Sequence, residues 1–195
     1  MARAVLAYSG GLDTSVAIRW LAERGHEVVA VAVDVGQQED FDEVVRRGTL
    51  AGATEVRVVD AVERFAEAFL TRAIKANGLY EGKYPMVSGL ARPLIVEEVV
   101  KVAREVGASV VAHGCTGKGN DQVRFEVGFR VLAPELEVLA PIRDDEIPRE
   151  KAVALASEWG IPIARLASSY SIDENLWGRT IECGPFFVND AATTE

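Results

Sequence analysis

The chain has 195 residues, enough for one domain with its own hydrophobic core. Its 30 acidic and 21 basic residues give a formal net charge of −9, which argues against a nucleic-acid partner, and its two cysteines, Cys115 and Cys183, favour a reducing, cytoplasmic location. No apolar run approaches the roughly 20 residues of a membrane span, and the N-terminal run breaks at Ser9, too early for a signal peptide, so no membrane partner is expected.

Short apolar runs alternate along the chain with longer stretches of helical periodicity. Strands are predicted at 3–8, 27–34, 55–60, 109–113 and 137–142. Helices are predicted near 13–25, 40–52, 61–76, 92–107, 121–133 and 148–159, several of them ending at a glycine suited to a left-handed cap: Gly25, Gly78, Gly107 and Gly160. Because the strands are nearly continuously apolar, helices should cover both faces. The pattern predicts an α/β fold, a doubly wound parallel five-stranded sheet.

The segment SGGLDTS, residues 9–15, joins the first predicted strand to the first helix, where such sheets bind ligands. Gly10 and Gly11 permit a sharp turn, and the helix start adds free N–H groups for an anion. The segment has neither the lysine of a Walker loop nor the third glycine of the dinucleotide motif. Asp13 among anions suggests pyrophosphate carried with Mg²⁺. The competing interpretation is a plain turn with Asp13 or Thr14 as the N-cap.

A second glycine-rich segment, AHGCTGKGNDQVRFE, follows the fourth predicted strand and leads into a helix beginning near Asn120 or Asp121. Asn120 and Arg124 share a helix face, Arg124 suits a carboxylate, and Asp121 suits an ammonium group. These residues predict an amino-acid site on the same rim as the first loop. An N-cap role for Asn120 or Asp121 and a solvated Arg124 are the competing interpretations. His113 and Cys115 are assigned no catalytic role.

SGGLDTS resembles the PP-loop of the ATP pyrophosphatases, which cleave ATP between the α and β phosphates and adenylate a carbonyl oxygen. Five motifs occur in order between residues 3 and 184, and together they resemble the argininosuccinate synthase family: AYSGGLDTS, VGQQEDFDE, LARP, HGCTGKGNDQVRFE and YSIDENLWGR. The resemblance implies a Rossmann-like adenine nucleotide alpha hydrolase fold. It also implies ATP-dependent condensation of citrulline with aspartate through a citrullyl-adenylate, with Mg²⁺, giving argininosuccinate, AMP and pyrophosphate.

The resemblance also implies binding residues. ATP would be held by Ala7, Tyr8, Ser9, Gly10, Gly11, Leu12, Asp13, Thr14, Ser15, Val33 and Gly114. Aspartate would contact Thr116, Asn120 and Asp121, and citrulline would contact Tyr84, Asn120, Arg124, Ser171 and Thr180. Ser88-Gly89 stands where a hydroxyl is expected before LARP, so Ser88 or backbone N–H groups would take that citrulline contact. The expected catalytic residues are Asp13, Asp121 and Arg124, and the metal ligands stay open. Tyr84 packing a loop and Ser171 capping IDENL are the competing interpretations.

Family members continue into a synthetase domain that completes the citrulline site and contributes to tetramer contacts. We therefore expect an ATP-binding domain over 1–165 and the start of the synthetase region over 166–195, ending in an irregular tail. Tyr84, Ser171 and Thr180 are expected in irregular segments. Apolar surface including Trp177, Phe186 and Phe187 is expected to be exposed or covered by another copy in a homo-oligomer. A tRNA-thiolating enzyme using Cys115 and Cys183, and an ATP-binding module without catalysis, are the alternative functions.

Overall fold

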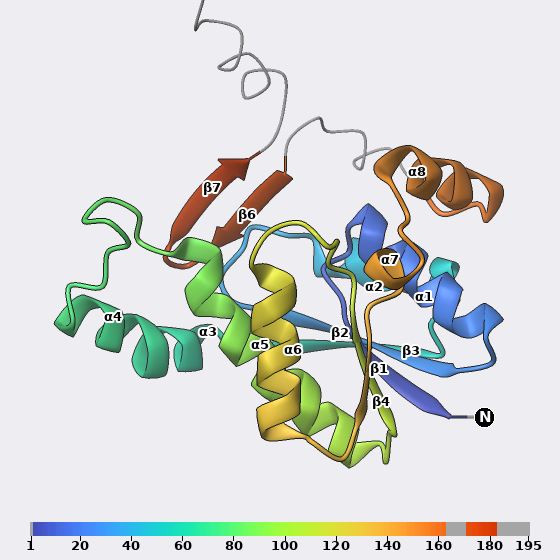
Figure 1. Cartoon of the computed structure of the whole chain (residues 1–195), viewed down its shortest axis with the longest axis horizontal. Coiled ribbons are helices and arrows are strands. Elements are labelled where there is room, and N and C mark those ends of the chain that lie inside the picture. The colour runs from blue at the N-terminus through green and yellow to red at the C-terminus, as the bar shows by residue number, and fades with distance from the viewer. Residues whose placement is uncertain (1, 163–170, 183–195) are drawn as a thin grey trace, which may run out of the picture.

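The structure, a computed structural model, describes residues 2–162 and 171–182 and confirms the predicted α/β fold. Five parallel strands form one sheet with the order β3-β2-β1-β4-β5 (Figure 1). They are β1 (Arg3–Ala7), β2 (Glu27–Asp34), β3 (Glu55–Asp60), β4 (Val110–His113) and β5 (Glu137–Leu139). The chain moves outward from β1 to β3 and then returns to place β4 on the other side of β1. The order therefore reverses between β1 and β4, the point where such sheets bind ligands.

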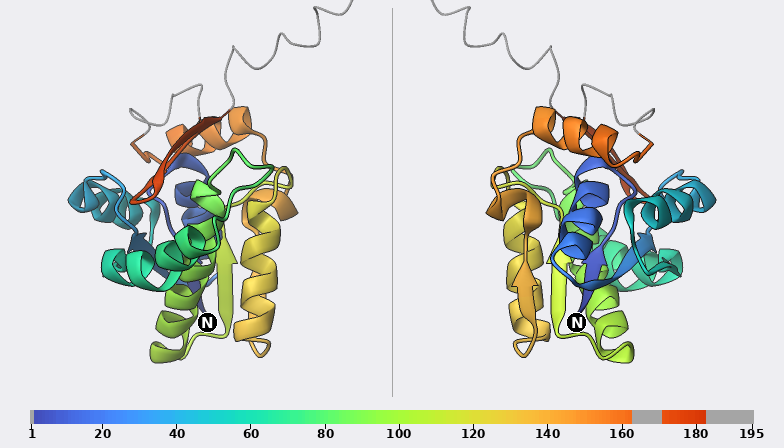
Figure 2. Two further views of the ribbon diagram at one scale, coloured as in Figure 1. Left: turned by 90° about the vertical axis from the view of Figure 1, so that its left-hand side faces the viewer. Right: turned by 90° about the vertical axis from the view of Figure 1, so that its right-hand side faces the viewer.

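Helices cover both faces of the sheet, as the apolar strands predict (Figure 2). In β1, Leu6 packs into one core cluster and Val5 into the other, because successive side chains point to opposite faces. The first cluster is covered by α1 (Leu12–Glu23), α2 (Phe41–Ala51), α7 (Pro141–Asp144) and α8 (Arg149–Glu158). The second is covered by η1 (Phe65–Leu70), α5 (Val87–Glu105) and α6 (Asp121–Leu132), with α3 (Val62–Arg64) and α4 (Thr71–Lys75) at the two ends of η1.

Helix α5 begins at Val87, earlier than the predicted start near residue 92, and it contains Pro93. A residue that precedes proline disfavours helical backbone, so the sequence pattern indicates a boundary there. In the structure, Val87, Ala91 and Leu94 continue one buried face through the proline, and Pro93 itself is exposed. Tertiary packing therefore overrides the local preference.

The segment 61–76, predicted as one helix, is divided into α3, η1 and α4. The wider turns of the π-helix η1 bring Phe65 and Leu70, five residues apart, into the core together. The predicted cap at Gly78 is wrong, because Asn77 takes the left-handed conformation there (φ 45°). The other three predicted cap glycines do have positive φ. The last strand is shorter than predicted because Pro141 opens α7.

A hairpin that the sequence analysis did not predict, β6 (Ser171–Asn175) and β7 (Gly178–Glu182), lies on the rim above the sheet (Figure 1). The Leu176 N–H donates to the Val35 carbonyl at 2.8 Å, and Trp177 Nε1 donates to the Pro85 carbonyl at 2.8 Å. The expected irregular placement of Ser171 and Thr180 is therefore wrong. Trp177 is partly buried against the chain's own core and is not an exposed surface.

Phe186 and Phe187 lie outside the described residues, as does the proposed tail, and the domain boundary near residue 165 stays a prediction. In the part of the chain that the structure describes, no helix is both long and apolar enough to span a membrane.

Candidate active site

A cleft of about 860 Å³ opens where the order of the strands reverses. The two glycine loops and the β6–β7 hairpin contribute to its walls. The predicted site residues that line it are Ala7, Tyr8, Ser9, Gly10, Gly11, Leu12, Asp13, Thr14, Val33, Gly114, Thr116 and Asp121. Those that do not line it are Ser15, Tyr84, Ser88, Asn120, Arg124 and Thr180, and the side chain of Ser171 is not among those described. The structure thus gathers most of the predicted ATP set and part of the amino-acid set.

The first loop contains a glycine with a left-handed backbone conformation and leads into a helix whose N-terminus has no side-chain cap. Gly10 has φ +72°, and a Cβ there would lie 2.9 Å from Val44 Cγ2, so the turn requires glycine. Gly11, not Asp13 or Thr14, is the N-cap of α1, and no side chain caps that helix. The first N–H groups of α1 are therefore available to an anion in the cleft. Thr14 Oγ1 donates to the Gly11 carbonyl at 3.2 Å, which braces the loop.

The two glycine loops touch each other at Thr14 and Gly114. A Cβ at Gly114 would lie 2.7 Å from Thr14 Cγ2 and 3.1 Å from Thr14 Cα. This contact places the end of β4 directly against the first turn of α1. The prediction that both loops converge on one rim is therefore confirmed.

Asp13 lies in the first turn of α1 and lines the cleft. Burial raises the pKa of its carboxyl above the usual value, and the positive charge of Arg149 acts in the opposite direction. A half-buried carboxylate whose charge is poorly solvated favours a cationic ligand. Asp13 therefore offers a carboxylate to a cation next to the first glycine loop.

Ser15, predicted as an ATP ligand, is fully buried, and its hydroxyl lies 3.2 Å from the Tyr8 hydroxyl. Ser15 lies on the buried side of α1, and its side chain does not line the cleft. Burial raises the pKa of Tyr8, and the hydrogen bond with Ser15 lowers it in part. Ser15 thus supports the loop through Tyr8, which does line the cleft.

Asp121, at the start of α6, is held by two guanidinium groups. Arg92 Nε donates to its Oδ2 at 2.9 Å, and Arg124 Nη1 donates to its Oδ1 at 2.5 Å. Arg92 Nη2 also donates to Asp173 of β6 at 2.6 Å. Burial lowers the pKa of Arg92, but the Asp173 and Asp121 carboxylates raise it more, so the guanidinium stays charged. One arginine of α5 therefore links α6 to the hairpin.

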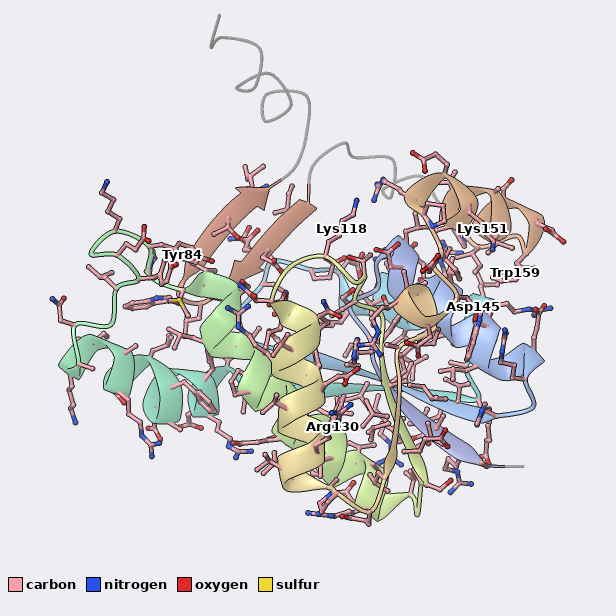
Figure 3. The ribbon with its side chains drawn as sticks, viewed as in Figure 1. Tyr84, Lys118, Arg130, Asp145, Lys151 and Trp159 are labelled. Carbon is pink, nitrogen blue, oxygen red and sulfur yellow. The ribbon has the colours of Figure 1, made fainter. Side chains whose placement is uncertain are left out.

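Three further residues predicted to bind citrulline, Ser88, Thr180 and Tyr84, lie on three different segments. Gly89, not Ser88, faces Arg124, since a Cβ on Gly89 would lie 3.4 Å from Arg124 Nη2, whereas Ser88 is buried. Thr180 lies in β7 opposite Asp173, and its buried hydroxyl has no hydrogen-bond partner among the described residues. Tyr84 lies on the loop that precedes α5 (Figure 3).

Asn120 occupies the N-cap position of α6, but its side chain makes no capping hydrogen bond there. Its carboxamide stays exposed. The N-cap interpretation of Asn120 is thus confirmed for the backbone position and not for the side chain.

His113 and Cys115 both line the cleft, and neither has the pKa of a neutral-pH catalyst. Burial and the nearby Arg143 lower the pKa of His113 to about 4, so the ring is neutral. Its Nδ1 accepts the Cys115 N–H at 3.2 Å. Burial and the Asp121 carboxylate raise the pKa of the Cys115 thiol to about 12, so it stays protonated.

Sequence reasoning missed the cationic residues of the cleft: Arg47, Arg92, Lys118, Arg149 and Arg179. Three of them stand inside quoted motifs that could have indicated them: Arg92 in LARP, Lys118 in HGCTGKGNDQVRFE and Arg179 in YSIDENLWGR. Figure 3 shows Lys118 on the second loop. Arg47 of α2 and Arg149 of α8 lie outside these motifs, so the sequence gives no local signal for them. Their approach to the cleft depends on the tertiary fold.

Mg²⁺ would fit this site as an ion shared with phosphate groups. No group of three or more His, Cys, Asp or Glu side chains suited to a metal occurs in residues 2–162 or 171–182. Mg²⁺ is commonly bound by one or two carboxylates together with substrate phosphates and water. Asp13 provides one such carboxylate beside the anion-binding loop.

Comparisons with known proteins identify related sequences and a similar fold. A family model described as "Arginosuccinate synthase N-terminal HUP domain" matches residues 3–162. Proteins named argininosuccinate synthase from Bacillus licheniformis and Listeria welshimeri are 56% and 54% identical over 93% and 92% of this chain. The chain spans 45% of the length of each of these curated relatives.

A solved structure described as a predicted subunit of tRNA methyltransferase from Methanocaldococcus jannaschii has a TM-score of 0.56 at 16% identity, covering 81% of this chain and 75% of that one. This likeness shows a shared fold alone. The match over residues 3–162 and the relatives above 50% identity establish more. The chain belongs to the argininosuccinate synthase family, and its residues 3–162 match the part described as the N-terminal HUP domain.

Proposed function

We propose that this chain binds ATP in the cleft and forms the nucleotide-binding part of an argininosuccinate synthase. The observation that carries the proposal is the contact of the two glycine loops at Thr14 and Gly114, which sets the open start of α1 beside the second loop. A pyrophosphate group in the first loop would meet the free N–H groups of α1 and the Ser9 hydroxyl. When bound, Mg²⁺ would neutralise phosphate charge beside Asp13.

In the proposed reaction, the ureido oxygen of citrulline attacks the α-phosphate of ATP, and pyrophosphate leaves into the first loop. The aspartate amine then attacks the activated carbon and expels AMP. Asp121 would accept from the aspartate ammonium beside Thr116 and Asn120. Arg124, which pairs with Asp121 in the structure, would exchange part of that pairing for the citrulline carboxylate. Catalysis would rest on positioning and on electrostatic stabilisation, without a covalent enzyme intermediate.

We propose that Ser171 and Thr180, brought to the rim by the hairpin, and Tyr84 complete the citrulline contacts. The position of Thr180 supports this, because it lies opposite Asp173 in the hairpin that forms part of the cleft wall. A homo-oligomer, as implied for longer family members, is part of the same proposal.

The test is pyrophosphate release by the purified chain, measured with ATP, Mg²⁺, citrulline and aspartate. We expect ATP binding by calorimetry. Any pyrophosphate release should require citrulline, and repeated turnover should require aspartate as well. Binding without turnover would favour an ATP-binding module. Tight tRNA binding with sulfur transfer would favour a thiolating enzyme, an alternative that the protonated Cys115 does not support. Absence of ATP binding would overturn the proposal.

A further inference from the structure

Arg47 of α2 lies directly beneath the first glycine loop. Its side chain is only 7% exposed, and one end of its guanidinium donates to the Gly10 carbonyl. The other terminal nitrogen pairs with Glu39 at 3.1 Å, and Nε donates to the Glu43 carbonyl at 3.3 Å. This buried arginine is therefore tied to the loop, to the segment before α2, and to α2 itself.

The hydrogen bond to the Gly10 carbonyl fixes the orientation of the Gly10–Gly11 peptide. No cis peptide bond occurs in the described ranges, so the carbonyl and the N–H of that peptide point in opposite directions. The Gly11 N–H donates to the Ser9 hydroxyl oxygen at 3.4 Å, and Ser9 lines the cleft, so a phosphate oxygen there would replace this long hydrogen bond. Holding the carbonyl on Arg47 thus keeps the Gly11 N–H toward the cleft, where a phosphate oxygen could take it.

The charge of Arg47 is compensated locally. Its Nε lies 3.7 Å from a Glu43 carboxylate oxygen, in addition to the pairing with Glu39. A buried cation with two carboxylate neighbours adds little net positive charge to a phosphate site. Its planar fork, however, reaches the Gly10 carbonyl and Glu39 together, and a lysine ammonium cannot reproduce that geometry.

We propose that Arg47 is a positioning residue for the phosphate loop: by holding the Gly10 carbonyl, it orients the Gly11 N–H toward the β and γ phosphates of ATP. The inference rests on the proposed function, since it takes the first loop as the phosphate site. It assigns Arg47 an effect on the pyrophosphate part of the nucleotide and none on the adenosine part.

The experiment compares ATP with AMP by calorimetry in Arg47→Lys and Arg47→Met. AMP keeps the nucleoside and the α-phosphate and lacks the group that the loop would hold. ATP affinity should fall at least about tenfold in both variants, because a hydrogen bond to a charged ligand is misaligned. AMP affinity should change less than about twofold. Arg46, the exposed neighbour that pairs with Glu43, provides the matched control, and Arg46→Met should leave both affinities unchanged.

Circular dichroism and thermal unfolding report whether each variant is folded. If Arg47→Met does not fold, the test relies on Arg47→Lys, which keeps a cation between Glu39 and Glu43. Unchanged ATP affinity in Arg47→Lys, or equal losses for ATP and AMP, would overturn the positioning role. Failure of the wild-type chain to bind ATP would overturn the proposed function, and the inference with it. ATP binding by the wild type, together with a loss of affinity in the Arg47 variants for ATP and not for AMP, supports both the proposed function and the positioning role.

Discussion

Gly114→Ala is expected to push the two glycine loops apart. The added Cβ would lie 2.7 Å from Thr14 Cγ2, and the backbone atoms Thr14 Cα and N would lie at 3.1 and 3.2 Å. Thr14 cannot easily give way, because its hydroxyl donates to the Gly11 carbonyl and α1 packs on the core. Overpacking of this kind costs about 1 to 3 kcal/mol. Because the strain falls on the phosphate loop, ATP affinity should fall at least about tenfold as well.

Gly117→Ala is the matched control in the same loop. A Cβ there would meet Arg143 Cγ at 3.5 Å, which is ordinary contact, so the expected stability change is below about 0.5 kcal/mol. Urea unfolding gives the stability of both variants, and calorimetry gives their ATP affinity. If Gly114→Ala matched the wild type in both measurements, the loops would not be in contact in solution and the reasoning would be refuted.

Asp13→Asn should stabilise the free protein at neutral pH, because burial raises the pKa of the native carboxyl and its charged form is unfavourable there. This gain in unfolding free energy should shrink as the pH falls and Asp13 protonates, and urea unfolding at several pH values would measure it. A gain that grows toward acid pH would contradict this. Mg²⁺-dependent ATP binding should weaken in the same variant. Arg92→Met should loosen the hairpin and cost about 1 to 3 kcal/mol, because it leaves Asp121 and Asp173 without their shared partner. Hydrogen exchange should speed up in β6 and β7, and not in the control Arg104→Met, an exposed arginine of the same helix. Cys115 in a Cys183→Ser background should react slowly with iodoacetamide at pH 8, since its pKa is about 12; rapid alkylation would contradict that burial.

The sheet and the convergence of the loops could be predicted from sequence because their signals are local. Continuous apolar runs indicate buried parallel strands, and glycine clusters directly after two of them indicate loops on one edge. The start of α5 could not be predicted, because Pro93 favours a boundary locally while the buried face of the helix continues through it. Only packing decides between these two influences.

The polar part of the site was predicted less well because it depends on distant segments. Arg92 joins Asp121 and Asp173, which are 29 and 81 residues further along the chain. The hairpin itself has short, charged strands with weak strand patterning, and it is held by contacts of Leu176 and Trp177 with the rim. Ser15 carries a hydroxyl of the kind that binds phosphate, but its position on α1 turns that hydroxyl toward Tyr8.

We propose above that the first glycine loop holds the pyrophosphate group of ATP. Calorimetric titration of inorganic pyrophosphate with Mg²⁺ into the wild-type chain and into Gly10→Ala tests it most directly. The variant places a Cβ 2.9 Å from Val44 Cγ2 at a residue with φ +72°, so the turn must distort. We expect saturable binding by the wild type and at least about tenfold weaker binding by Gly10→Ala. Equal affinity in the two proteins, or no binding by the wild type, would contradict it.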